Sequence, residues 1–201
     1  LMVRETDRSG LSFHFAYDGR SSGAKCVRTW GDGGVFDHVI HYDQQNRKTI
    51  VENSTGHVTL YQRDPFEQVV KIVDAHGGAS TFEYDETHGL SVKATNASGH
   101  GIERKLDARG RVVAVVGPDG ATSRLEYDAR DLVVRLTDPS GGSWTWSYDL
   151  AWQLAEESRP DGSVTRYAWN GGLLVAAEGA GGRRTVVEYD ARKMPRVFHG
   201  P

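Results

Sequence analysis

The chain has 201 residues, 38% of them hydrophobic, and its formal net charge of −3 comes from charges of both signs interleaved along the sequence. There is no basic block to indicate a nucleic-acid partner and no apolar run long enough to span a bilayer. Five Trp, eight Tyr, six Phe and 24 Gly argue against disorder and favour short strands joined by tight turns. The lone Cys26 excludes an internal disulfide and suits a reducing compartment. Because the chain starts at Leu1 without a signal-peptide pattern, we expect a fragment of a longer protein.

The first two Tyr-Asp dipeptides, Tyr17-Asp18 and Tyr42-Asp43, are separated by an irregular stretch, residues 19–43, in which we predict an insertion. His38 and His41 are the nearest approach to a metal-ligand cluster. Residues three apart on a strand face opposite sides, so we expect no metal site there. The other histidines are expected to be solvated in turns: His57, His76, His88 and His100.

From Asp43 onward the same signature recurs every 20 to 22 residues, which is the mark of a repeat architecture. The aspartate position is filled by Asp18, Asp43, Asp64, Asp85, Asp107, Asp128, Asp149, Asn170 and Asp190. Tyrosine precedes it at Tyr17, Tyr42, Tyr84, Tyr127, Tyr148 and Tyr189, while Arg63, Leu106 and Trp169 replace it elsewhere. A glycine stands eight positions before the aspartate at Gly120, Gly141 and Gly162. Nine units in register thus cover the chain.

One unit, residues 121–142, shows the expected local structure. Residues 121–127 alternate in polarity and predict a strand, with Ser123, Leu125 and Tyr127 on one face. Asp128 begins a turn, because its carboxylate can accept a backbone N–H two residues on. A second strand follows over residues 132–137, and we expect Val133, Arg135 and Thr137 to share one face. Residues 150–157 have helical propensity, but they occupy the turn and second-strand positions of their unit, so we predict a strand.

The recurring residues have a structural and a chemical interpretation. The tyrosines are expected to form a ladder of stacked rings between hairpins, and the alternative is a sugar-binding platform. The aspartates are expected to cap turns, because acid–base catalysis needs two carboxylates that converge across a cleft. We expect no catalytic, metal-binding or cofactor-binding residues.

Several stretches carry a family resemblance: residues 120–128 followed by Asp131-Leu-Val-Val, and Arg159-Pro-Asp-Gly-Ser-Val-Thr-Arg-Tyr-Ala-Trp. They resemble the RHS/YD repeats of bacterial Rhs polymorphic toxins. The resemblance implies β-hairpins that pair into one antiparallel sheet, which curves and spirals into a hollow cocoon around a C-terminal toxin. We therefore expect residues 1–201 to be an all-β RHS/YD segment of such a shell and not an enzyme. A toxin enzyme and a self-cleavage site would lie elsewhere in the full-length protein.

The partners that the resemblance implies are the remainder of the shell and its toxin, and, through other regions, a secretion-apparatus spike or a chaperone. The protein would be made in the bacterial cytoplasm and exported, with type VI secretion in interbacterial competition as the expected setting. The alternative is a cell-surface adhesion or carbohydrate-binding scaffold with exposed indoles at Trp30, Trp144, Trp146, Trp152 and Trp169. A third hypothesis places a hydrolase in residues 30–43.

Overall fold

The computed structural model describes residues 1–199, which form strands, turns and two short 3-10 segments. The chain divides into two compact units, residues 1–102 and 103–201. The predicted all-β class and the tandem antiparallel hairpins are confirmed. No helix among the described residues is long and apolar enough to cross a membrane.

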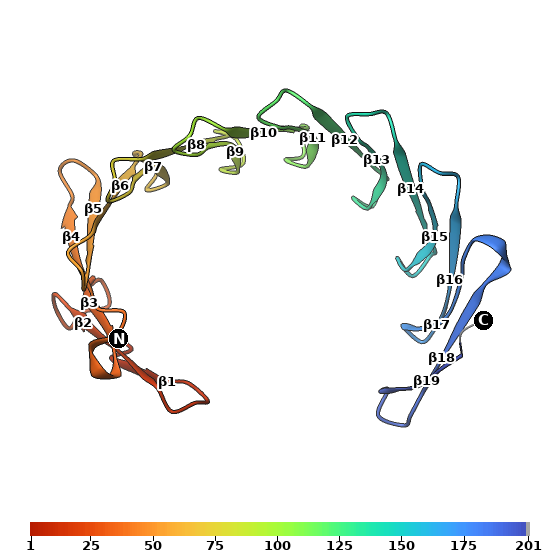
Figure 1. Cartoon of the computed structure of the whole chain (residues 1–201), viewed down its shortest axis with the longest axis horizontal. Helices are drawn as coiled ribbons and strands as arrows, with labels where there is room; N and C mark the ends of the chain where they lie inside the picture. Colours follow the sequence, from red (N-terminus) through yellow and green to blue (C-terminus); the bar gives the residue numbers. More distant parts are fainter. Residues whose placement is uncertain (200–201) are drawn as a thin grey trace. The chain divides into compact units, whose positions relative to one another are not determined.

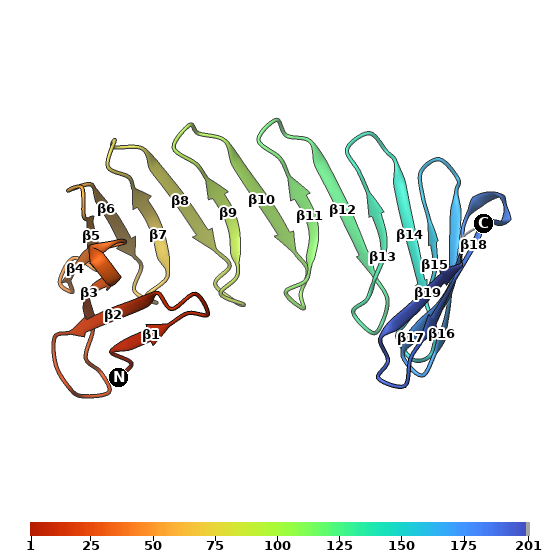
Figure 2. The same ribbon diagram turned by 60° about the horizontal axis from the view of Figure 1, so that its bottom comes forward.

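Unit 1 pairs its strands in chain order, each antiparallel to the next, from β1 to β9 (Figure 2). Its elements are β1 (Arg4–Thr6), β2 (Ser12–Tyr17), β3 (Cys26–Gly31), η1 (Asp32–Gly34), β4 (His38–Asp43), β5 (Lys48–Asn53), β6 (Val58–Arg63), β7 (Val69–Val73), β8 (Ala79–Tyr84) and β9 (Ser91–Thr95). In the predicted irregular stretch, residues 18–25 link Tyr17 to Cys26, whereas residues 128–132 make the same link in a regular repeat.

Unit 2 repeats the pattern from β10 to β19. Its elements are β10 (Gly101–Leu106, which starts at the unit boundary), β11 (Val112–Val116), β12 (Thr122–Tyr127), β13 (Val133–Thr137), β14 (Ser143–Tyr148), β15 (Leu154–Ser158), β16 (Val164–Asn170), β17 (Leu173–Glu178), η2 (Ala180–Gly182), β18 (Arg184–Tyr189) and β19 (Pro195–His199). Residues 150–157 form a turn followed by β15, as their position in the repeat predicts. Register therefore overrides helical propensity there.

A β-bulge interrupts nearly every hairpin at the same place. In β12–β13, Glu126 pairs with Arg135 but Tyr127 pairs with Val133, so Val134 has no partner of its own. The same shift occurs in β2–β3, β6–β7, β8–β9, β10–β11, β14–β15, β16–β17 and β18–β19. The prediction that Val133 shares a face with Arg135 is therefore wrong, because the extra residue of a bulge reverses the alternation.

In unit 2 the two faces of the sheet differ in chemistry, as the cross-strand partners of β12 to β16 show. The apolar face carries Leu125, Leu136, Trp144 and Trp146. The charged face carries Glu126–Arg135 and Glu156–Arg166 ion pairs. This alternation is what a period-2 polarity pattern produces.

Each unit is a single layer of strands (Figures 1 and 2), so neither builds a closed core. Ala114 and Ala176 are the buried hydrophobic residues of the described chain. The accessible surface is 13506 Å² for 22.1 kDa. A compact monomer of that mass would expose roughly 9,300 Å². The apolar side chains are thus half-buried against neighbours in the sheet, and one whole face remains uncovered.

Candidate functional site: the Tyr-Asp repeat signature

The aspartate of each regular repeat caps its hairpin turn. Asp128 Oδ1 accepts the backbone N–H of Arg130 at 2.9 Å and that of Leu132 at 3.0 Å. The same pair of bonds forms in the hairpin turns at Asp64, Asp107, Asp149 and Asp190, and in the turns between hairpins at Asp7, Asn53, Asp74, Asn96 and Asp138. The turn pattern of the sequence predicted the first of these bonds, and the second bond, to the N–H four residues on, was not predicted.

These bonds favour the charged carboxylate. At Asp107 the Arg111 side chain also donates to the carboxylate, and together with the backbone N–H groups it lowers the pKa of Asp107 to about 2. The Ser140 hydroxyl and the turn N–H groups likewise lower the pKa of Asp138. Carboxylates held as acceptors in this way stabilise turns and are poor proton donors at neutral pH.

The turns also need one residue with a positive φ. Gly120, Gly141 and Gly162 take this position between hairpins, with φ of 82°, 91° and 80°. Within hairpins Asp131 and Trp152 occupy it at 68° and 67°. A type I turn followed by a left-handed residue is a common three-residue hairpin connection, and glycine adopts it without strain.

Three signature aspartates depart from this pattern because their loops differ in length. Asp18 Oδ1 accepts the N–H of Lys25 at the end of the long loop. Asp43 accepts from the backbone and side chain of Asn46. Asp85 bonds the backbone and ring of His88. All three carboxylates still act as turn acceptors.

The recurring tyrosines form hydrogen bonds and are not stacked. Tyr148 Oη donates to the Val133 carbonyl of the preceding hairpin at 2.9 Å. The equivalent bonds are Tyr17 to Met2, Tyr42 to Cys26, Tyr84 to Val69, Tyr127 to Val112 and Tyr189 to Leu174, at 2.7–2.9 Å. The expectation of stacked rings is wrong, since the ring–ring contacts of the described residues do not involve these tyrosines.

The bulge explains why the tyrosine bond exists. Backbone pairing between β13 and β14 covers only residues 135–137 and 143–145. The Val133 carbonyl lies beyond the last pair, and the Tyr148 hydroxyl satisfies it. At Trp169 the indole Nε1 donates to the Leu154 carbonyl at 2.7 Å, so tryptophan performs the same role.

Arg63 is an exception that supports this explanation. The β4–β5 hairpin has no bulge, and β5 pairs with β6 over five residues, Lys48–Glu52 with Val58–Gln62. The Arg63 backbone N–H itself bonds the Arg47 carbonyl at 2.9 Å. Where backbone pairing continues to the end of the strand, no aromatic donor is needed. Leu106 also lacks a donor, and no such account applies to it.

Side chains tie neighbouring Asp turns together along one edge. Arg111 and Arg109 each donate to Asp131 at 2.6 Å, which joins the turn at Asp107 to the turn at Asp128. Arg130 Nη1 donates to the Asp149 carbonyl at 2.8 Å and joins the next turn. These partly exposed bonds add modestly to stability and fix the spacing of the turns.

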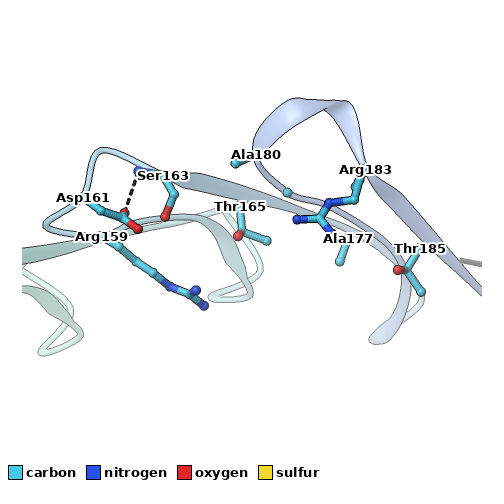
Figure 3. A pocket seen from close by; sticks show the side chains of 9 residues that line it. Arg159, Asp161, Ser163, Thr165, Ala177, Ala180, Arg183 and Thr185 are labelled. Carbon is cyan, nitrogen blue, oxygen red and sulfur yellow. Dashed lines mark hydrogen bonds between the residues drawn. The ribbon is translucent and has the colours of Figure 1, made fainter. Parts of the chain in front are cut away.

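An open groove of 570 Å³ lies beside the turns that flank β16 and β17 (Figure 3). The groove exists because small side chains line it, among them Thr165, Ala177 and Thr185. Thr165 pairs with Glu157, and Ala177 pairs with Thr185. One repeat before the Glu157–Thr165 pair, the larger Leu136 and Trp144 occupy the equivalent positions. Arg159 and Arg183 reach into this space from opposite sides (Figure 3). Asp161 is the one carboxylate of the lining, so the groove does not hold a convergent acid–base pair.

Ser12 and His14 of β2 lie beside Asp32 of the irregular stretch, but the three residues do not form a nucleophilic triad. Asp32 accepts the backbone N–H of Ser12 at 2.9 Å and bonds His14 Nε2 at 2.9 Å. The Ser12 hydroxyl is fully buried and bonds Arg4 and Thr6, not His14. The arrangement anchors the 3-10 turn η1 on β2.

The other sequence candidates also stay apart. His38 and His41 both lie on β4, three residues apart, which puts their side chains on opposite faces. Across the described residues, no group of three or more His, Cys, Asp or Glu could hold a metal ion. The signature aspartates act as turn caps, and the signature tyrosines donate hydrogen bonds to backbone carbonyls.

Comparison with known proteins agrees with this repeat geometry. The RHS Repeat family model matches residues 107–143 and 127–164. Residues 107–164 therefore belong to the RHS-repeat family. Among curated relatives, the chain is 31% identical over 173 residues to Toxin protein Tse5 of Pseudomonas aeruginosa, covering 84% of this chain and 13% of that protein. It is 27% identical over 128 residues to Double-stranded DNA deaminase toxin A of Burkholderia cenocepacia, covering 64% of this chain and 9% of that protein.

Solved structures show the same fold at low sequence identity. The TcdB2-TccC3-TEV crystal structure matches with a TM-score of 0.74 and 13% identity, covering 94% of this chain and 11% of that one. The Photorhabdus luminescens Tc holotoxin pore matches with a TM-score of 0.62 and 12% identity, covering 98% of this chain and 11% of that one. This RHS-repeat chain therefore spans a small part of every relative named here.

Proposed function

We propose that these residues are a wall segment of an Rhs-type shell that sequesters a toxin until delivery. The observation that carries the proposal is a single-layer sheet whose apolar face is uncovered. Leu125, Leu136, Trp144 and Trp146 lie on that face and are only half-buried within the sheet. A contiguous apolar face of this kind marks a surface that another polypeptide covers, because removing apolar groups from water is favourable.

The names of the relatives support a toxin as the covering group. Both curated relatives are named as toxins, and they are much longer than the segment that this chain matches. We propose that the enclosed toxin polypeptide covers the apolar face, while the charged face meets solvent. Export by type VI secretion, competition between bacteria and a spike or chaperone partner belong to the same proposal, and they rest on the likeness to Toxin protein Tse5.

Face-specific photo-cross-linking of the full-length protein tests the proposal. A photoreactive benzoylphenylalanine replaces Trp146 on the apolar face, and Ser147 on the charged face is the matched control one residue away. We expect position 146 to cross-link to the toxin region of the same chain, and position 147 to give little product. Equal yields, or no intramolecular product from position 146, would refute the containment role.

The adhesion or carbohydrate-binding alternative finds less support. No aromatic ring is among the nine residues that line the groove of Figure 3. Trp152 is 59% exposed, whereas Trp30, Trp144, Trp146 and Trp169 are half-buried. A sugar-binding groove needs aromatic faces in its lining and this groove has none, so containment is the better interpretation.

A further inference from the structure

Two histidines from successive turns lie close together in unit 1. His57 ends the turn between β5 and β6, and His76 lies in the turn between β7 and β8. Their ring centroids are 6.1 Å apart, with an interplanar angle of 50°. Both residues are exposed, and the repeat architecture requires neither of them.

The hydrogen bonds around His57 fix its tautomer. Asn53 Oδ1 accepts the backbone N–H groups of Thr55 and His57, which identifies that atom as oxygen. The Thr55 hydroxyl therefore donates its single hydrogen to Asn53 Oδ1 at 2.7 Å. Thr55 Oγ1 then accepts from His57 Nδ1 at 2.9 Å, so Nδ1 carries the proton. His57 Nε2 is left with a free lone pair, which is the form of histidine that binds metals.

We propose that His57 and His76 chelate one divalent transition-metal ion, of the Zn²⁺ or Ni²⁺ class, across the two turns. Imidazole nitrogen suits these ions. A nitrogen about 2.0–2.1 Å from zinc puts the ring centre about 3.2 Å from the ion, so two ring centres on one ion lie about 4.5 Å apart at a right angle, about 5.2 Å apart at the tetrahedral angle and up to about 6.4 Å apart when linear. The observed separation of 6.1 Å lies within this range.

The surroundings favour a cation and a solvent-completed site. Asp74, in the same turn as His76, carries a carboxylate and lines the groove beside His57. Water completes the coordination, because no third histidine, cysteine or carboxylate joins the pair in the described chain. Thr55 orients the His57 ring from behind. The bound ion links two neighbouring repeats at the edge opposite the Tyr-Asp turns, and this role is independent of containment.

Isothermal titration of the full-length protein with ZnCl₂ and NiCl₂ tests the proposal. His57→Ala and His76→Ala should each abolish the binding event that wild type shows. His100→Ala is the matched control, because His100 ends the turn between β9 and β10 just as His57 ends the turn between β5 and β6. The backbone N–H of His100 donates to Asn96 Oδ1, and that of His57 donates to Asn53 Oδ1. The His100 variant should bind as wild type does.

Thr55→Val removes the hydroxyl that fixes the tautomer and should weaken binding about tenfold, as loss of an outer-shell partner does. Circular dichroism checks that each variant keeps its strands. If the His57 variant does not fold, the His76 variant alone tests the proposal. Three results would each overturn the proposal: no metal binding by wild type, unchanged binding by both single variants, or an equal loss in His100→Ala.

Discussion

The bond from Tyr148 to the Val133 carbonyl allows a quantitative test of how neighbouring hairpins are joined. Tyr148→Phe removes one hydroxyl and leaves the ring in place. The Val133 carbonyl then loses its 2.9 Å partner at a position where β13 and β14 no longer pair. Leaving a partly buried acceptor unsatisfied costs about 1–2 kcal/mol. We expect the free energy of unfolding to fall by that amount.

Guanidinium denaturation monitored by circular dichroism measures the change, and hydrogen exchange of residues 133–135 and 145–148 locates it. Tyr61→Phe is the control, because no hydrogen bond of the described chain involves the Tyr61 hydroxyl. It should cost under about 0.5 kcal/mol, which is typical of a change that removes no such interaction. If Tyr148→Phe costs no more than Tyr61→Phe, the tyrosine bonds do not join the hairpins, and ring packing alone explains the repeat.

Two further predictions concern the turns. Gly141→Ala should lower the free energy of unfolding by about 1 kcal/mol, because φ is +91° there although a Cβ would meet nothing within 4 Å. Gly23 has as much space for a Cβ as Gly141 but no positive φ, so Gly23→Ala should leave the free energy of unfolding unchanged in the same denaturation assay. An equal loss of stability in the two variants would contradict the explanation from backbone conformation. The depressed pKa of Asp107, about 2, means that its contribution to stability is complete above the unfolded pKa near 3.9 and is lost as pH falls toward 2. Asp107→Asn should flatten the pH dependence of stability between pH 4 and pH 2, and an unchanged slope would count against the Arg111 bond.

The strands and turns could be predicted because their causes lie within a few residues. Alternating polarity over residues 121–127 places β12, and an aspartate with a left-handed residue three positions later places the turn. Even residues 150–157, with their helical propensity, follow the repeat register. Local pattern and turn chemistry agree at each position, which is what makes such a sequence predictable.

The bulge and the tyrosine bond could not be predicted, because nothing in composition marks them. Val134 is one valine among several, and its lack of a partner depends on the register of two strands together. The offset from tyrosine to carbonyl is 15 residues for Tyr127 and Tyr148 and 16 for Tyr42, and it can be recognised only when the partner is known. A single sequence shows the recurring spacing of the tyrosines but not the carbonyl that each tyrosine satisfies.

The two kinds of junction between hairpins share one requirement. A strand that ends its backbone pairing early leaves carbonyls facing its neighbour, and each must find a donor. At β13–β14 a tyrosine on the next hairpin supplies the donor, and at β5–β6 continued pairing makes one unnecessary. The bulge therefore creates the need that an aromatic donor meets at most junctions, and Leu106, which follows the bulged β8–β9 hairpin, is the exception. Each such bond reaches only the adjacent hairpin. The stability of either unit is therefore the sum of the stabilities of its hairpins and of the contacts between adjacent hairpins. A single-layer sheet can for this reason grow by repetition without a closed core.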